Sequence, residues 1–249
     1  MIMERDFSVE PTNARACGRK ECNGVGCFRW FLDEGNFKLC PSGSWTYWLA
    51  TIHEVAANGK KDHTRWILDW LVDVVRNPTA GSARPTTSLV INGEPGRGKS
   101  SIIWPIKQIL YQYTHKCNTI EEALNGLSES FRLTGFNSYL EDAGLLVVDG
   151  IDWVDLRKLN ELISKDTITI QRKGVNSYQV PNFIRLYAML NKTWFVPNHN
   201  HRSVVFNASD RHQGDHEWFA KMREANLAEL LDEIYGWIIK TDIGHNPQM

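Results

Sequence analysis

The sequence of 249 residues carries no excess charge of either sign. Its 28 Lys and Arg residues balance 29 Asp and Glu residues, which leaves a formal net charge of −1. A near-neutral chain has no overall field that attracts a polyanion, so nucleic-acid binding would have to come from locally placed cations or from basic loops gathered by oligomerisation. With 42% hydrophobic and 23% charged residues, the composition excludes an intrinsically disordered chain.

Long hydrophobic runs are also lacking. No run approaches the roughly 18 apolar residues that a membrane-spanning helix needs, and the N-terminus does not have the apolar stretch of a signal peptide. We therefore expect a cytoplasmic chain without a membrane partner.

Cysteine is scarce and odd in number, which favours reduced thiols over a disulfide framework. Four of the five cysteines follow a C-x4-C-x4-C-x12-C pattern: Cys17, Cys22, Cys27 and Cys40. The short C-x2-C knuckle typical of zinc sites is missing from this pattern. Both interpretations stay open: a zinc site, or four free thiols.

The clearest motif follows a short apolar run at residues 88–91, which is typical of a buried parallel strand. The motif is G-x-x-x-x-G-K-S, in which backbone N–H groups wrap phosphates, the Lys neutralises the outer phosphates and the Ser offers a hydroxyl to Mg²⁺. We therefore expect a nucleotide and Mg²⁺ as cofactors. The expected nucleotide-binding residues are Gly93, Glu94, Pro95, Gly96, Arg97, Gly98, Lys99, Ser100 and Ser101.

A second buried-strand pattern at residues 144–149 ends in Asp149, where a P-loop fold needs an acid for its metal. This assigns Ser100 and Asp149 to Mg²⁺; the alternative is an ordinary strand followed by an Asp-Gly turn.

Hydrophobic periodicity predicts the remaining elements. Helices are expected from residue 62 to 74, after the P-loop with Pro105 bending the second turn, around 156–163, and from 215 to 239 with an apolar stripe interpreted as core. Strands are expected at 167–171 and 178–180, forming a hairpin with a basic tip, at 184–190 and around 205–206. The first 60 residues show no sustained periodicity and suggest an irregular or mixed cap.

These elements predict an α/β fold with a central, mainly parallel sheet of P-loop (AAA+-like) topology, flanked by helices and preceded by a small N-terminal helical region. We expect a cap and helical region at residues 1–85 and the P-loop ATPase domain at residues 86–249.

The order of several segments carries a family resemblance. These are residues 7–11, the 67–71 helix with Asn77-Pro78, the P-loop, Phe136-Asn137, the Asp149 strand, residues 163–166 leading to 172–174, 190–192, His201-Arg202 and Asp242-Ile243. The ordered set resembles the ATPase domain of superfamily 3 helicases, similar to the C-terminal part of phage and poxvirus-type (virulence-associated E-like) primase-helicases.

The resemblance implies a role for several residues. Asn191 resembles the sensor residue that contacts the terminal phosphate or orients the attacking water. Arg202 resembles an arginine finger, a cation that one subunit supplies to the nucleotide of its neighbour. Arg211 is the second candidate for this finger. Lys173 with Gly174 resembles the hairpin that grips single-stranded DNA in the channel of a hexamer, where Arg172 and Lys165 would assist.

One position departs from the family pattern. A Glu that polarises the attacking water usually follows the metal-binding acid, whereas this chain has Gly150 there. Asp152 could substitute from the next turn, or the chain could bind ATP and hydrolyse it poorly. No segment resembles the family's primase domain, so we expect a separate primase or other replication proteins as partners.

We therefore expect an oligomeric ATP-dependent DNA helicase or translocase that serves viral or mobile-element replication. An ATP-gated DNA-binding or loading module with weak hydrolysis is the main alternative. A P-loop small-molecule kinase is a third, and it would need an acceptor pocket and an Arg-rich lid.

Overall fold

A computed structural model describes residues 45–76, 87–113, 138–141, 143–150, 156, 160, 163–192, 202–224 and 226–231. Its centre is a four-stranded parallel sheet in the order β2-β5-β1-β6. The strands are β1 (Ser88–Asn92), β2 (Leu145–Asp149), β5 (Arg185–Leu190) and β6 (Ser203–Asn207). The expected α/β fold with a parallel sheet is confirmed, and one strand, β5, separates the P-loop strand β1 from β2.

Both faces of this sheet are buried, which is why its strands are continuous apolar runs. Along β1, Leu89 and Ile91 belong to one hydrophobic cluster and Val90 to the other. The same division continues on β2, where Val147 faces the first cluster and Val148 the second.

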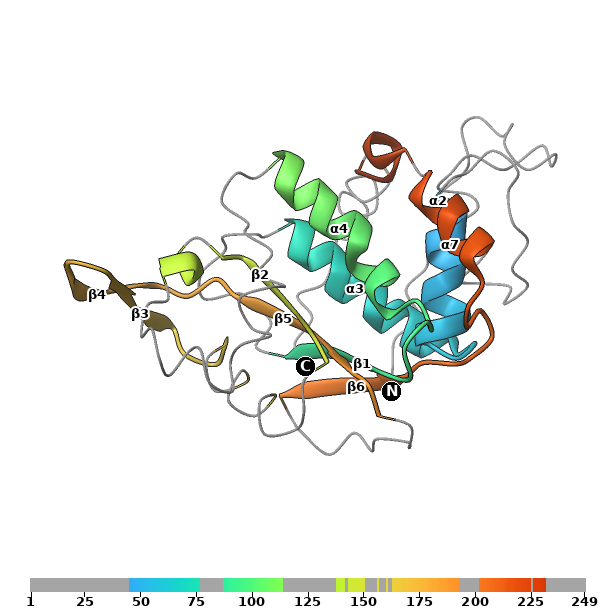
Figure 1. The fold of residues 1–249 in the computed structure, drawn as a ribbon, viewed down its shortest axis with the longest axis horizontal. Helices are drawn as coiled ribbons and strands as arrows, with labels where there is room; N and C mark the ends of the chain where they lie inside the picture. Colours follow the sequence, from blue (N-terminus) through green and yellow to red (C-terminus); the bar gives the residue numbers. More distant parts are fainter. Residues whose placement is uncertain are drawn as a thin grey trace, which may run out of the picture.

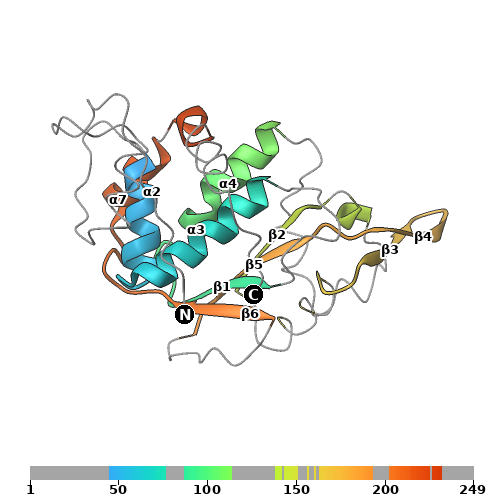
Figure 2. The same cartoon turned by 180° about the vertical axis from the view of Figure 1, so that it is seen from behind.

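Helices cover one face of the sheet, as the two opposite views show (Figures 1 and 2). They are α3 (Lys61–Arg76), α4 (Lys99–Tyr113) and the short α2 (Trp45–Ala50), which continues into a π-helical turn, η1 (Thr51–Ala56). The expected small N-terminal helical region is confirmed, and it includes residues 45–56, where the sequence shows no sustained periodicity. The indole N–H of Trp48 donates to the Ile102 carbonyl over 2.7 Å, so α2 is attached to the helix that follows the P-loop.

Strands β3 (Thr167–Arg172) and β4 (Val175–Pro181) form the expected hairpin, an antiparallel pair separate from the central sheet. Figure 1 shows this hairpin extending away from the helices at one end of the molecule. Ile168 and Ile170 are buried in the second cluster, whereas Thr169 between them is exposed. Gly174 at the tip has φ of +76°, which the tight turn between the strands requires.

The C-terminal helix is shorter than the periodicity predicts. Helix α7 begins at His216 and ends at Arg223, and residues 227–231 form a separate helical segment. The Asp215 carboxylate accepts a hydrogen bond from the Trp218 N–H over 3.0 Å and so caps the first turn of α7.

Several expectations fall outside the described residues: the boundary between residues 85 and 86, Asp152, His201 and the four cysteines. Within the described ranges, no cluster of three or more His, Cys, Asp or Glu side chains could hold a metal ion. Among the helices of those ranges, none combines the length and the apolar character that crossing a bilayer requires.

Candidate nucleotide-binding site

The P-loop connects the carboxyl end of β1 to the first turn of α4. Lys99 begins the helix, and its side chain folds back so that Nζ donates to the carbonyls of Gly93 and Glu94, the latter over 2.9 Å. The side chain is only 6% exposed. The P-loop backbone therefore already surrounds the Lys99 side chain. Its ammonium group lies within the loop, where this motif neutralises phosphate charge.

Burial is the main influence on this lysine. Removal from water lowers the pKa of Lys99 below its usual value, while the nearby Asp149 carboxylate acts in the opposite direction. Behind the loop, the buried Tyr187 hydroxyl donates to the Lys99 carbonyl over 2.7 Å, and burial raises the pKa of Tyr187 well above its usual range. Tyr187 therefore stays protonated and fixes the start of α4 on strand β5.

The C-terminal part of the chain holds the loop from outside. The Gly214 N–H donates to the Gly96 carbonyl over 3.2 Å, and the Gln213 amide donates to the Pro95 carbonyl over 3.3 Å. A Cβ on Gly98 would stand 2.4 Å from the Phe219 ring of α7, and Gly98 has φ of +79°. Only glycine fits at Gly98, because the ring of α7 lies directly on the loop.

Arg97 belongs to the scaffold of the loop. Its guanidinium donates to the Ala208 carbonyl over 2.8 Å and forms an ion pair with Glu94 at 3.1 Å. These contacts attach the loop to the residue that follows β6. The expectation that Arg97 binds nucleotide directly stays a prediction, and the described contacts give it a structural role.

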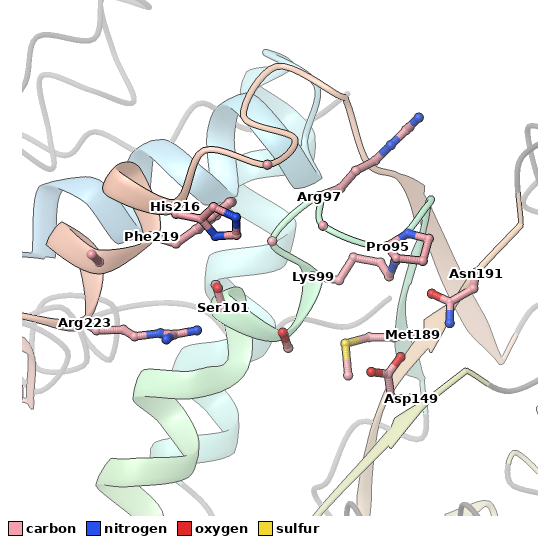
Figure 3. Close-up of a pocket in the computed structure, with 15 residues that line it drawn as sticks. Pro95, Arg97, Lys99, Ser101, Asp149, Met189, Asn191, His216, Phe219 and Arg223 are labelled. Carbon is pink, nitrogen blue, oxygen red and sulfur yellow. The ribbon is translucent and has the colours of Figure 1, made fainter.

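Polar side chains from two strands meet at the carboxyl edge of the sheet. Asp149 ends β2 and Asn191 directly follows β5, and both line the same cavity as Lys99. The Asn191 amide nitrogen lies 3.4 Å from the point where a Cβ on Gly150 would stand. Figure 3 shows the two side chains on the same side of Lys99, so the sequence-predicted sensor and metal acid do come together.

The donor set around this edge fits Mg²⁺. The Ser100 hydroxyl and the Asp149 carboxylate both line the cavity, and these are the oxygen ligands that Mg²⁺ takes in phosphate sites, where it uses few protein ligands besides the phosphates and water. These two residues would hold the ion, which would neutralise phosphate charge.

A second wall of the cavity comes from α7, and the sequence motifs do not reveal it. His216, Phe219, Ala220 and Arg223 line the cavity, and Figure 3 shows His216, Phe219 and Arg223 across it from Asp149 and Asn191. Their spacing of i, i+3, i+4 and i+7 places them on one helix face, a pattern that could have identified them as a group. The cavity measures about 420 Å³, within the range of small-molecule sites.

Arg202 lies at the opposite edge of the sheet. It directly precedes β6, and Ser203 pairs with Ser88 at the amino end of β1. Five residue-to-residue steps along the strand, roughly 16 Å at 3.3 Å per step, lead from Arg202 to Asn207 beside the P-loop edge. Arg202 is exposed there and lies far from the nucleotide site of its own chain.

The reserve residue, Arg211, is tied within its own chain. Its Nε pairs with the Glu54 carboxylate at 3.0 Å, and His212 contacts the same carboxylate at 2.9 Å. These contacts join the segment before α7 to η1.

The three cations of the predicted DNA hairpin are not equivalent. Arg172 forms an ion pair with Glu141, which also accepts a hydrogen bond from the Tyr178 hydroxyl at 2.8 Å. Lys173 is exposed at the tip and makes no hydrogen bond or ion pair within the described part of the chain. Lys165 precedes β3 at the other end of the hairpin, where its carbonyl accepts from Asn182 over 2.8 Å, so the structure does not gather all three.

Comparison with known proteins supports the fold. A family of unknown function, DUF5906, matches residues 91–207, which is less than half of the chain. No curated protein matches the sequence. An apo structure of the NrS-1 C-terminal region (305–718) is 17% identical with a TM-score of 0.54, covering 77% of this chain and 44% of that chain. An A-form apo structure of the same region is 16% identical, also at 0.54, covering 72% and 41%.

This likeness shows the fold alone at such identities, and the present chain spans less than half the length of the NrS-1 region. A structure of JCV helicase with a bound small molecule is 14% identical and covers 90% of this chain and 68% of that chain. Its TM-score of 0.39 is too low to establish a shared fold.

Proposed function

We propose that this chain is the ATPase part of a DNA helicase or translocase of superfamily 3 type. It binds ATP with Mg²⁺ in the P-loop cavity and moves along single-stranded DNA as a ring, hexameric by family resemblance. The observation that carries the proposal is the meeting of Lys99, Asp149 and Asn191 from three different elements around one cavity. Phosphoryl transfer depends mostly on positioning and charge stabilisation, and these three groups supply both.

Each group has a distinct task in ATP hydrolysis. Lys99 neutralises the outer phosphates, while Asp149 with Ser100 holds the metal. Asn191 contacts the terminal phosphate or orients the water whose oxygen attacks the γ-phosphorus. The bond to the bridging oxygen then breaks, and ADP and phosphate leave.

The site departs from the family pattern at the base that accepts the proton of the attacking water. Gly150 has no side chain and has φ of +71°, a backbone conformation that disfavours the family's Glu at this position. Asp152, outside the described residues, is our candidate for that task. This position also supports the second candidate function, an ATP-gated DNA-binding module that binds nucleotide with little turnover.

Two further placements support the proposed DNA contact and the proposed oligomer. Lys173 stands exposed at the tip of a hairpin that extends from the body of the molecule (Figure 1), so a ring could gather several such tips in one channel despite the near-neutral chain. Arg202, at the sheet edge away from its own P-loop, suits a cation supplied to a neighbouring subunit. Replication partners such as a separate primase are part of the same proposal.

Steady-state ATP hydrolysis with and without single-stranded DNA tests the proposal. Wild-type protein should hydrolyse ATP faster when DNA is present, and Lys99→Ala should abolish turnover. Lys60→Ala removes an exposed lysine away from the cavity and is the matched control. Tight ATP binding without turnover would favour the gated module, and turnover that depends on a small-molecule acceptor in place of DNA would favour a kinase. No ATP binding at all would contradict all three functions.

A further inference from the structure

The cavity has two chemically different ends, with Lys99 between them. Asp149 and Asn191 form one end, and the α7 residues His216, Phe219 and Arg223 form the other (Figure 3). In a P-loop the lysine and the metal ligands bind the outer phosphates. A bound nucleotide would therefore point its terminal phosphate towards Asp149 and Asn191, and its inner phosphate and nucleoside would extend towards α7.

The side chain of Arg223 supplies a positive charge at this second end. Arg223 lines the cavity, and in Figure 3 its guanidinium points towards Ser101 in the first turn of α4. Arg223 makes no hydrogen bond or ion pair with any other residue that the structure describes. By contrast, the neighbouring cation Lys221 is paired with Glu217 at 2.6 Å and does not line the cavity.

Contacts of α7 with the P-loop and with η1 already fix the position of Arg223 beside the cavity, so no movement of the helix is needed to bring it there. The Phe219 ring packs on Gly98, and the Gly214 N–H is bonded to the Gly96 carbonyl. On the other side of the helix, the Trp218 indole N–H donates to the Thr51 hydroxyl over 2.9 Å. The helix is thus anchored both to the P-loop and to η1, which keeps the arginine fork at the rim of the cavity.

We propose that α7 is the nucleoside-side wall of the ATP site and that Arg223 binds the inner phosphate of the nucleotide held by its own chain. The inference rests on the proposed ATP binding and adds a ligand that no P-loop motif contains. An arginine suits this task because its planar guanidinium binds phosphate oxygens through two parallel hydrogen bonds. ATP and ADP share the inner phosphate, so Arg223 contributes equally to the binding of both.

Calorimetric titration of the full chain with ATP and with ADP, in the presence of Mg²⁺, tests the inference. Arg223→Ala should weaken both nucleotides by the same factor, about tenfold or more for a lost charge-assisted contact. Arg223→Lys, which keeps the charge but not the fork, should lose less. Lys221→Ala, on the same helix, should bind both nucleotides as the wild type does. Thermal unfolding of each variant separates a local loss from a folding defect.

The possible outcomes separate this inference from the proposed function. If wild-type protein binds neither nucleotide, the proposed function fails and the inference fails with it. If wild-type protein binds both and Arg223→Ala is unchanged, the inference alone is overturned. A loss for ATP without a loss for ADP would also overturn it, because Arg223 would then contact the terminal phosphate.

Discussion

The ring of Phe219 occupies the space into which a Cβ on Gly98 would project, with two ring carbons 2.4 Å from that position. The P-loop and α7 are therefore in direct contact at a glycine whose φ of +79° already disfavours other residues. The glycine that the motif requires for phosphate binding is the same glycine on which the second wall of the cavity rests.

Gly98→Ala should abolish or strongly weaken ATP binding, because the methyl group must displace either the loop or α7. Gly59→Ala is the matched control: its φ is +74°, and nothing lies within 4 Å of the added Cβ. Both variants carry the backbone cost of about 1–2 kcal/mol in the free energy of unfolding, but only Gly98→Ala should lose nucleotide. Equal ATP titrations for the two variants would show that the contact with Phe219 is dispensable.

Installing at position 150 the Glu that superfamily 3 helicases usually carry should not increase turnover. At φ of +71° any side chain is strained, and the new Cβ would lie 3.4 Å from the Asn191 amide nitrogen. We expect Gly150→Glu to lose about 1–2 kcal/mol in the free energy of unfolding and to hydrolyse ATP no faster than wild type. Denaturant unfolding and steady-state hydrolysis measure the two effects. A faster enzyme would mean that this backbone turn adapts readily.

Asp152→Asn is the companion variant, since it keeps the volume of the side chain and removes its basicity. Turnover that survives this change would exclude Asp152 as the base.

Two inactive variants should restore each other's activity if Arg202 acts on the neighbouring subunit. Arg202→Ala should bind ATP but not hydrolyse it, whereas Lys99→Ala should fail to bind. In a mixed oligomer, an intact P-loop from the first variant can meet an intact Arg202 from the second. Hydrolysis by the mixture, with none from either variant alone, would support a shared site. If Arg202→Ala alone hydrolysed ATP normally, the role in the neighbouring site would be wrong.

Lys173→Ala should weaken single-stranded DNA binding and lower its salt dependence. Each phosphate contact contributes about 0.7 to the slope of log K against log salt on single strands. Fluorescence anisotropy at several salt concentrations measures this slope. Lys60→Ala, an exposed lysine far from the hairpin in sequence, is the control. An unchanged slope for Lys173→Ala would remove the tip from the DNA interface.

ATP affinity should fall at alkaline pH, and the fall should begin below the ordinary lysine value of 10.5, because burial lowers the pKa of Lys99 in the free protein. Bound phosphates stabilise the protonated form and raise this pKa again, so binding takes up a proton once the free lysine begins to deprotonate. Calorimetry in buffers of different ionisation enthalpy measures this uptake. Lys99→Arg, which stays charged, should show none.

Much of the central fold could be predicted from the sequence because buried parallel strands appear as short, continuous apolar runs. The runs at residues 89–91 and 145–148 are apolar throughout and are followed by Asn92 and Asp149, and both lie in strands of the sheet. Alternation at residues 167–171 likewise indicated a half-buried strand, with Ile168 and Ile170 inside.

The α7 wall could not be predicted in the same way. Its cavity-lining residues have helical spacing, but the same spacing is typical of a helix that packs on a core, as the sequence suggested for this segment. Arg223 lies beside the cavity because Phe219 on the same helix packs against Gly98. These two residues are 121 positions apart, and a contact over that separation leaves no signal in the local sequence pattern. Helix α2 was not predicted for a similar reason, since its contacts are with distant segments: Trp48 donates to Ile102 of α4, and the Tyr47 ring packs against Trp218 of α7.

The stack of His212 on Trp218, with ring centroids 3.8 Å apart and planes 17° apart, gives the chain an optical signal of its own. Trp218 belongs to the helix that touches the P-loop, and its partner belongs to the segment tied to Glu54. Any step that tilts α7 away from the loop separates the two rings and alters the emission of this indole. The difference in emission between wild type and Trp218→Phe would therefore report whether α7 is packed against the P-loop, without an added dye.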